Sequence, residues 1–195
     1  MSTHDYQQPV SRGLDSAEET ITIADTARRL MIPLLVAALV IAVDQLTKAW
    51  VLRTWPEPHT GEIPIIDGWL ALTYTQNTGV AFGLFRGFPQ FFTVTSIIIV
   101  GAALYWYVTR RPQPQRWLAL CLGLIVGGAL GNVIDRIRFG YVVDFIKTFD
   151  GRFPVFNVAD SCIVVGICVT ALLLARSEVE DAGRHSSASE AGDGV

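Results

Sequence analysis

The sequence predicts an all-α membrane protein, with four transmembrane helices and a small extracytoplasmic β-cradle. Of its 195 residues, 51% are hydrophobic and only 17% are charged, with a mean hydropathy of +0.40, whereas soluble domains carry about 25% charged residues. Ten of the 18 Asp and Glu residues lie near the two ends, in residues 1–29 and 176–195. Residues 30–175 contain four long apolar stretches instead. This pattern excludes both a disordered chain and an ordinary soluble enzyme.

Four segments satisfy the requirement for a membrane-spanning helix, which is about 20 mostly apolar residues. They are Leu30–Leu52, Gly87–Thr109, Trp117–Ile134 and Phe153–Ala175. The first is not typical of a cleaved signal peptide, because a long acidic segment precedes it where a signal peptide has a short basic one. We therefore predict a membrane domain at residues 30–175, between polar tails at residues 1–29 and 176–195.

The distribution of Lys and Arg predicts that both termini lie in the cytoplasm. With four spans, Arg28, Arg29, Arg176 and the three arginines of residues 110–116 all fall on one side of the membrane. The loop after the third span is also basic, so the bias is not complete. The opposite ends of the spans would then lie near the outer face.

The loop between the first two spans predicts a small sheet. Leu70–Thr75 is rich in β-formers and partly alternating, and Asn77–Gly79 is a turn signal. We expect this sheet to lie on the outer membrane surface. No internal repeat is evident, so an inverted-repeat transporter finds no support.

Charge and residue usage exclude two further kinds of site. A net charge of −3 offers no basic surface for nucleic acid. Cys121, Cys162 and Cys168 lie within apolar runs, where cysteine behaves as a small hydrophobic residue. The three histidines have no metal-ligand spacing. We therefore expect neither a metal nor a cofactor.

Polar side chains gather near the predicted outer ends of the spans, where the membrane makes them costly and where they indicate function. Asp44 and Lys48 lie four residues apart on one helix face and can neutralise each other. They fit either a structural ion pair or part of a site. Asn132, Asp135 and Arg136 share one face at the end of the third span.

Two further carboxylates are candidates for catalysis. Asp144 lies in the apolar segment Tyr141–Ile146, and Asp160 follows 16 residues later in Phe156–Ser161. Asp160 taken alone is more typical of a helix start with Asn157 as its N-cap. If the two carboxylates converge in a poorly hydrated site, one can take a proton from water while the other polarises a carbonyl and protonates the leaving nitrogen. Serine chemistry has less support because the chain has no G-x-S-x-G motif.

Two other functions use the same features. An ion- or proton-coupled transporter would also place carboxylates in the membrane, but it needs a polar path to the cytoplasmic face. Ile97–Ala103 and Leu118–Val126, in the inner halves of the second and third spans, contain no charged residue. A non-enzymatic scaffold would use the acids only as helix caps, and it would tolerate replacement of Asp144 by Asn.

Five segments, taken together and in order, resemble one family. They are Asp44–Lys48, Asn77–Gly83, Gly131–Arg136, Gly140–Ile146 and Phe156–Asp160. The chain is similar in these segments to the signal peptidase II family, the lipoprotein signal peptidases of bacterial inner membranes. The long acidic N-terminal tail and the polar C-terminal tail depart from the family pattern.

The resemblance implies an aspartic endopeptidase with four helices, cytoplasmic termini and an outer β-cradle. It implies cleavage of prolipoproteins just before a diacylglyceryl-modified cysteine, contact with membrane lipid, and inhibition by globomycin-type antibiotics. Asp144 and Asp160 match the catalytic pair. The residues expected to surround this pair and hold substrate are Asp44, Lys48, Asn77, Gly79, Asn132, Asp135, Arg136 and Asn157.

Overall fold

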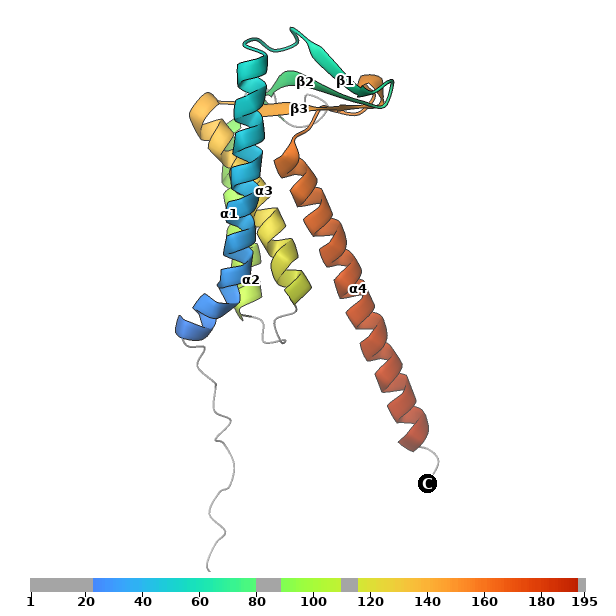
Figure 1. Ribbon diagram of the computed structural model, residues 1–195. Coiled ribbons are helices and arrows are strands. Elements are labelled where there is room, and N and C mark those ends of the chain that lie inside the picture. The colour runs from blue at the N-terminus through green and yellow to red at the C-terminus, as the bar shows by residue number, and fades with distance from the viewer. Residues whose placement is uncertain (1–22, 80–88, 110–115, 193–195) are drawn as a thin grey trace, which may run out of the picture.

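The computed structural model describes residues 23–79, 89–109 and 116–192 of the chain. The described residues form a helical bundle with a small antiparallel sheet across one end (Figure 1). The elements in chain order are helix α1 (Ile23–Thr54), strands β1 (Glu62–Ile66) and β2 (Leu70–Asn77), helices α2 (Pro89–Thr109) and α3 (Arg116–Phe139), strand β3 (Val142–Thr148), the short 3-10 helix η2 (Phe149–Gly151) and helix α4 (Val158–Gly192).

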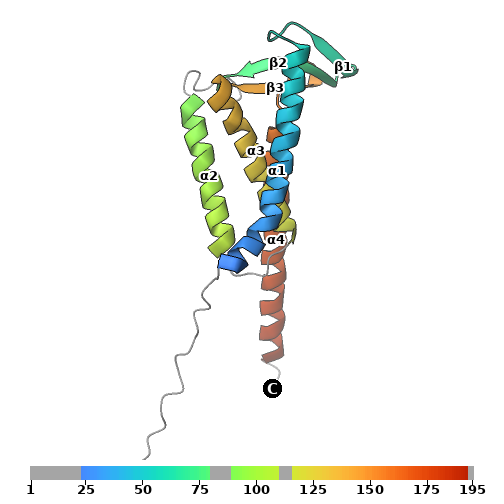
Figure 2. The same ribbon diagram turned by 60° about the vertical axis from the view of Figure 1, so that its left-hand side comes forward.

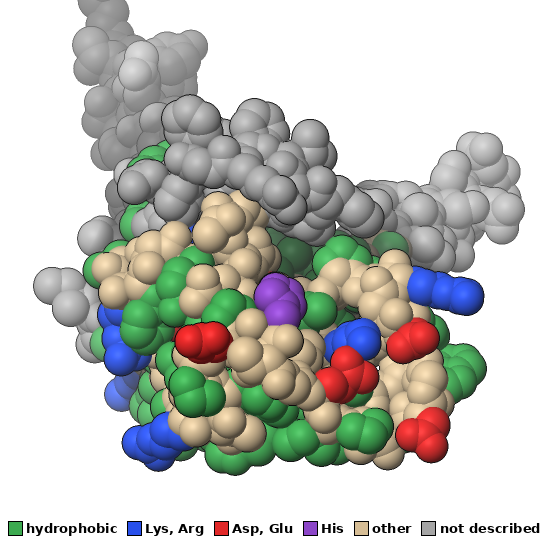
Figure 3. Space-filling model, turned by 90° about the horizontal axis from the view of Figure 1, so that it is seen from above, with side chains coloured by type: hydrophobic (Ala, Val, Ile, Leu, Met, Phe, Trp, Pro, Cys, Tyr) green, Lys and Arg blue, Asp and Glu red, His purple; other side chains and the backbone are tan. Residues whose placement is uncertain are grey.

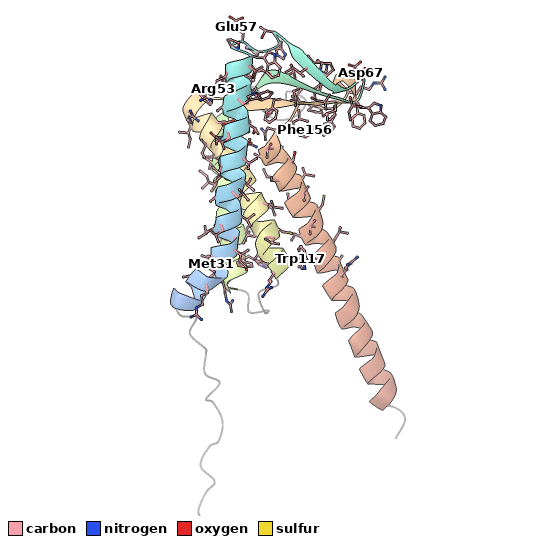
Figure 4. The ribbon with its side chains drawn as sticks, viewed as in Figure 1. Met31, Arg53, Glu57, Asp67, Trp117 and Phe156 are labelled. Carbon is pink, nitrogen blue, oxygen red and sulfur yellow. The ribbon has the colours of Figure 1, made fainter. Side chains whose placement is uncertain are left out.

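Helix α3 is the centre of the bundle. It packs against α1, α2 and α4, and its face toward them is buried over most of its length. In Figure 2, α2 lies on one side of α3, and the sheet extends over α1 on the other side. Figures 1 and 2 both place the sheet across the same end of the helices. The start of α1 and the end of α4 lie at the opposite end of the bundle (Figure 1). In Figure 4, Met31 and Trp117 mark that opposite end.

Three described helices are long and apolar enough to cross a membrane: Thr26–Thr54, Arg116–Phe139 and Val158–Arg176. They correspond to the first, third and fourth predicted spans. The second prediction coincides with α2, in which only Ser96–Thr109 forms an apolar helix in the searched residues, shorter than a full span. The prediction of a mostly helical membrane protein with a small sheet is thus confirmed, whereas a total of four spans stays a prediction.

The predicted span ends differ from the observed helix ends for local reasons. The third helix continues past Ile134 to Phe139 and ends at Gly140, which adopts a φ of 79° and donates its N–H to the Arg136 carbonyl, the usual glycine stop of a helix. The fourth helix starts at Val158, not at Phe153, because Phe156 pairs with the backbone of Ile146. It then continues through the predicted polar tail to Gly192.

Glycines allow the helices to approach closely, as small residues commonly do in membrane proteins. A Cβ atom at Gly127 of α3 would lie 2.8 Å from the Val40 Cβ and 2.9 Å from the Ala37 Cα on α1. A Cβ atom at the next residue, Gly128, would meet the Ala159 carbonyl and the Ile163 side chain of α4. These contacts hold α1 and α4 against two adjacent faces of α3, since consecutive residues of a helix lie about 100° apart.

The sheet joins two parts of the sequence. Its strand order is β1-β2-β3, all antiparallel, and the register places Thr75 opposite Asp144 and Asn77 opposite Val142. The strand predicted at Leu70–Thr75 is therefore present and extends to Asn77. Strand β3 around Asp144 was not predicted, because its first four residues are all buried and show no alternation of apolar and polar residues.

The sheet covers the end of the bundle with one face and is exposed on the other. Val51, Trp55, Tyr74, Val143 and Phe145 form a buried cluster between the sheet and the end of α1. The opposite face carries acidic and basic side chains beside apolar ones (Figure 3). Phe156, labelled in Figure 4, lies where the sheet meets the start of α4.

We predict that Gly127→Ala weakens the α1–α3 packing and lowers the melting temperature in mild detergent. Overpacking a closely packed contact typically costs about 1–3 kcal/mol. Gly101→Ala in α2 is the matched control, because a Cβ atom there meets no described atom within 4 Å and alanine is the better helix former. Equal melting temperatures for the two variants would contradict the close contact.

Candidate functional site

Asp144 lies on β3 with its carboxylate turned into the structure. Its side chain is almost fully buried, at 1% exposure. Both carboxylate oxygens accept hydrogen bonds from asparagine amides: Oδ1 from Asn157 at 2.7 Å and Oδ2 from Asn77 at 2.9 Å. Asn77 in turn accepts the N–H of Gly79 at 3.1 Å, which closes the turn after β2.

Asp160 lies in the first turn of α4. The Asn157 side-chain oxygen accepts the Asp160 N–H at 3.0 Å, and the Asp160 carboxylate accepts the Asn157 N–H at 3.3 Å. This reciprocal pair is a capping box, with an aspartate in the place of the usual glutamate. The predicted capping role of Asn157 is therefore present. It leaves the other oxygen of Asp160 free to accept the amide of Asn132 at 2.7 Å.

Asn157 connects the two carboxylates. Its Nδ2 donates to Asp144, and its Oδ1 and backbone N–H contact Asp160. The same Nδ2 lies 3.1 Å from the Asn132 Oδ1. The side chain is completely buried, so its amide orientation is set by these partners. Asp160 can therefore take part in the cap of α4 and also pair with Asp144, because Asn157 forms hydrogen bonds in both arrangements.

The Asp44–Lys48 ion pair predicted from the i, i+4 spacing is present, with 2.8 Å between the Lys48 Nζ and the Asp44 Oδ2. Asp135 of α3 adds a second carboxylate, 2.9 Å from the same ammonium. The exposed fractions of Asp44, Lys48 and Asp135 are 0%, 2% and 0%. A cation in such surroundings is tolerated only when paired, and here two opposite charges surround it.

Arg136 and Gln45 complete the polar end of the bundle. Arg136 is half-buried and interacts electrostatically with Asp160, Asp144 and Asp135. Gln45, which the sequence analysis quoted but did not assign, donates to Asp135 at 2.8 Å and accepts from Arg138 at 3.1 Å. One signal in the sequence could have identified Gln45: it lies next to Asp44 in Asp44–Lys48, a segment that resembles the family.

All ten residues predicted for the site are thus brought to one end of the bundle, beside the sheet. The segment Val80–Gly83, part of the second matched segment, lies outside the described residues. Among the described residues, no group of three or more His, Cys, Asp and Glu side chains could hold a metal ion. The charged and polar groups gathered at this end include carboxylates, amides and two cations, Lys48 and Arg136.

Burial and a neighbouring charge change the acidity of Asp144. Its pKa rises from 3.8 to about 7, first because burial disfavours the charged form and second because Asp160 is close enough to repel it. The amides of Asn77 and Asn157 oppose this rise by hydrogen bonding to the carboxylate. Two interacting carboxylates, one buried and protonated near neutral pH, form an arrangement suited to general acid–base chemistry.

Comparison with known proteins identifies the family. The family model described as signal peptidase (SPase) II matches residues 36–176. The chain belongs to the signal peptidase II family. Its members are hydrolases of lipoprotein processing, so the protein is a membrane protease.

Three curated proteins similar to this chain each match more than two thirds of it. The lipoprotein signal peptidase of Shouchella clausii is 49% identical over 134 residues, which is 68% of this chain and 85% of the relative. That of Symbiobacterium thermophilum is 43% identical over 140 residues, or 70% of this chain and 90% of the relative. That of Streptococcus thermophilus is 39% identical over 151 residues, or 77% and 96%.

Two solved structures of bacterial membrane enzymes are similar in fold to this chain. One aligns with a TM-score of 0.67 and 34% identity, covering 75% of this chain and 88% of its own. The other aligns with a TM-score of 0.65 and 35% identity, covering 73% and 91%. The polar end of the bundle is therefore built on an enzyme fold.

We predict that the stability of the parent protein falls relative to that of Asp144→Asn as the pH rises from about 4 to about 7. Between these pH values Asp144 is more often protonated in the folded protein than in the unfolded chain. Its contribution to the free energy of unfolding is therefore complete below the pKa of the unfolded chain, and it is lost as the pH rises through the pKa of the folded protein. The difference grows by at most about 1.4 kcal/mol per pH unit. Melting temperatures in detergent across this pH range measure it.

The matched control is Asp150→Asn, which removes an exposed carboxylate just after β3. This variant should follow the parent. If Asp144→Asn also follows the parent at every pH, the buried carboxylate does not gain a proton on folding.

Proposed function

We propose that the protein is an aspartic endopeptidase that removes the signal peptide from diacylglyceryl-modified prolipoproteins, cleaving just before the lipidated cysteine. Asp144 and Asp160 would form the catalytic dyad. The observation that carries this proposal is the position of Asn157, whose side-chain amide donates to the Asp144 carboxylate at 2.7 Å while its backbone N–H donates to the Asp160 carboxylate at 3.3 Å. Family membership supports the substrate class, because relatives at 39–49% identity carry the name lipoprotein signal peptidase.

The proposed chemistry needs only water and one shared proton. The ionised carboxylate takes a proton from water, and the hydroxide equivalent attacks the carbonyl carbon of the scissile peptide bond. The protonated carboxyl donates to the carbonyl oxygen, and a proton then passes to the leaving nitrogen as the C–N bond breaks. The raised pKa of Asp144, about 7, keeps one proton on the pair near neutral pH. We assign the protonated role to Asp144 and the ionised role to the more exposed Asp160.

The surrounding amides and Arg136 suit a substrate-holding role. Asn77, Asn132 and Asn157 orient the two carboxylates, and Gly79 closes the turn beside them. We propose that the peptide backbone of the substrate contacts this group and Arg136. The expected substrate contacts of Asp44, Lys48 and Asp135 fit less well, because all three are buried and paired with one another.

The proposed orientation places the site at the outer face of the bacterial inner membrane. Four spans, with α2 as the second, would return both termini to the cytoplasm. The apolar surface of the helices supports residence in lipid, since Leu35, Leu39 and Leu46 of α1 are 66%, 65% and 71% exposed. The diacylglyceryl group of a substrate could then stay in the outer leaflet while its peptide bond reaches the dyad. Globomycin-type antibiotics would act at the same site.

We predict that Asp144→Asn and Asp160→Asn each lower cleavage of a diacylglyceryl prolipoprotein to less than a tenth of the parent rate. Residues that act as one unit lose nearly full activity when either is removed. A gel-shift assay with purified protein in detergent measures the rate. Asp150→Asn, which removes an exposed carboxylate, should retain the parent activity.

Folded protein must be confirmed for each variant by its melting profile. If either dyad variant, once shown to be folded, cleaves at more than about a tenth of the parent rate, a loss below ~1.4 kcal/mol, the dyad assignment is wrong. A fully active Asp144→Asn would instead favour a helix-capping and structural role for these acids.

We also predict that a matched precursor without the lipid is cut far more slowly than the lipidated one. The bilayer already solvates the acyl chains, so the main contribution of the lipid is to position the scissile bond. Measurement of kcat/KM for the two precursors tests this. Equal values would indicate a general peptidase that does not recognise lipid.

A further inference from the structure

The Lys48 ammonium uses all of its hydrogen-bonding capacity within the protein. A lysine has three N–H donors and no acceptor. In this structure the three partners are Asp44 at 2.8 Å, Asp135 at 2.9 Å and the Asn132 side-chain oxygen at 3.0 Å. No donor remains for a substrate, and the side chain is 2% exposed. A role other than substrate contact must therefore explain why a charge is buried here.

One partner of Lys48 holds the backbone next to the first catalytic candidate. The Asp135 Oδ2, which receives the ammonium, also accepts the backbone N–H of Val143 at 3.0 Å. Val143 immediately precedes Asp144 on β3 and is fully buried. The position of the Asp144 backbone is thus tied to α3 through a charge-assisted hydrogen bond, which is about twice as strong as a neutral one.

Asp44, the other carboxylate partner of Lys48, holds the backbone next to the second catalytic candidate, Asp160. The Asp44 Oδ1 accepts the backbone N–H of Ala159 at 3.0 Å, and its Oδ2 receives the Lys48 ammonium. Ala159 immediately precedes Asp160 in α4 and is fully buried. Each aspartate of the proposed dyad is therefore preceded by a residue whose N–H is held by a carboxylate of the same ion cluster.

A third connection runs through Asn132. Its Oδ1 accepts from Lys48, which leaves its Nδ2 to donate to the Asp160 carboxylate at 2.7 Å. A positive charge on one side of this amide fixes which end faces Asp160. The Lys48 ammonium thus orients the Asn132 amide so that its nitrogen, a donor, and not its oxygen faces the Asp160 carboxylate.

We propose that Lys48 is a positioning residue for peptide cleavage: with Asp44 and Asp135 it sets the separation and hydrogen bonding of the Asp144 and Asp160 carboxylates. The inference rests on the proposed function of these two aspartates and adds a role for a residue that touches neither. Because catalysis depends strongly on placement of the reacting groups, loss of the cluster changes turnover more than substrate affinity.

Lys48→Met provides the main test, because it keeps the length of the apolar stem and removes only the ammonium. We expect kcat for a diacylglyceryl prolipoprotein, per folded enzyme, to fall by about 10-fold or more, while KM changes by less than about 3-fold. The pH profile of kcat should also shift, because the Lys48 charge lowers the pKa of Asp144 and its removal lets that pKa rise further. Folded enzyme is quantified by its melting transition in detergent.

Two outcomes overturn the inference. An unchanged kcat and pH profile per folded molecule, with only a lower melting temperature, means that Lys48 is merely structural. A raised KM with unchanged kcat means that it binds substrate. Lys147→Met is the matched control: Lys147 lies on β3 near Asp144 but pairs with Glu62 on the exposed side of the sheet, at 2.6 Å. Its kcat, KM and pH profile should equal those of the parent.

A second pair of variants decides the matter if Lys48→Met does not fold. Asp135→Asn keeps an oxygen that can accept the Val143 N–H, whereas Asp135→Ala removes it. At equal folded fraction we expect Asp135→Asn to retain a higher kcat than Asp135→Ala, with similar KM values. Equal kcat values overturn the positioning role.

Asp144→Asn in the same assay separates this inference from the proposed function. If that variant is inactive and Lys48→Met behaves as the parent, only the positioning role fails. If Asp144→Asn is itself active, the dyad fails, whatever the lysine variants do.

Discussion

The burial of the Lys48 ammonium is the constraint on which the polar end of this structure depends. A cation withdrawn from water is stable only where opposite charge and acceptors surround it completely. Here the acceptors come from two helices, since Asp44 belongs to α1 whereas Asp135 and Asn132 belong to α3. The two helices can therefore meet in one register only, because a shift of either would leave a buried charge without its partner.

Close packing along the helices makes that arrangement possible. Gly127 brings α1 against α3 one turn from Gly131, whose missing side chain leaves space for Asp44: a Cβ atom there would lie 2.7 Å from the Asp44 Oδ2. Apolar contact and ionic contact thus specify the same approach of the helices. No described buried side-chain nitrogen or oxygen lacks a hydrogen-bond partner, which is the condition under which a buried polar network orders its members.

Local patterns were sufficient for the elements and for part of the site. Apolar stretches of spanning length predicted three of the helices, and the i, i+4 spacing predicted the Asp44–Lys48 pair, because both depend on residues close in sequence. Strand β3 was missed, since a strand buried on both faces has no alternation to detect. The link from Asp144 to Asp160 through Asn157 depends on how β3 and α4 are brought together in the fold. Sequence spacing does not reveal this, so the prediction that the two aspartates share one site came from the family resemblance.

Helix α4 is secured mainly near its start. Its first three turns pack against α3 through Ala159, Ile163 and Gly166, whereas Ile167 and Leu172 farther along are 53% and 64% exposed. Beyond that packed start the helix runs away from the other helices (Figure 1) and extends past the end of the bundle (Figure 2). Helices adapt to a thinner or thicker bilayer by tilting. Because α4 is held at its start, a tilt displaces its far end most and its first turn, where Asp160 lies, least.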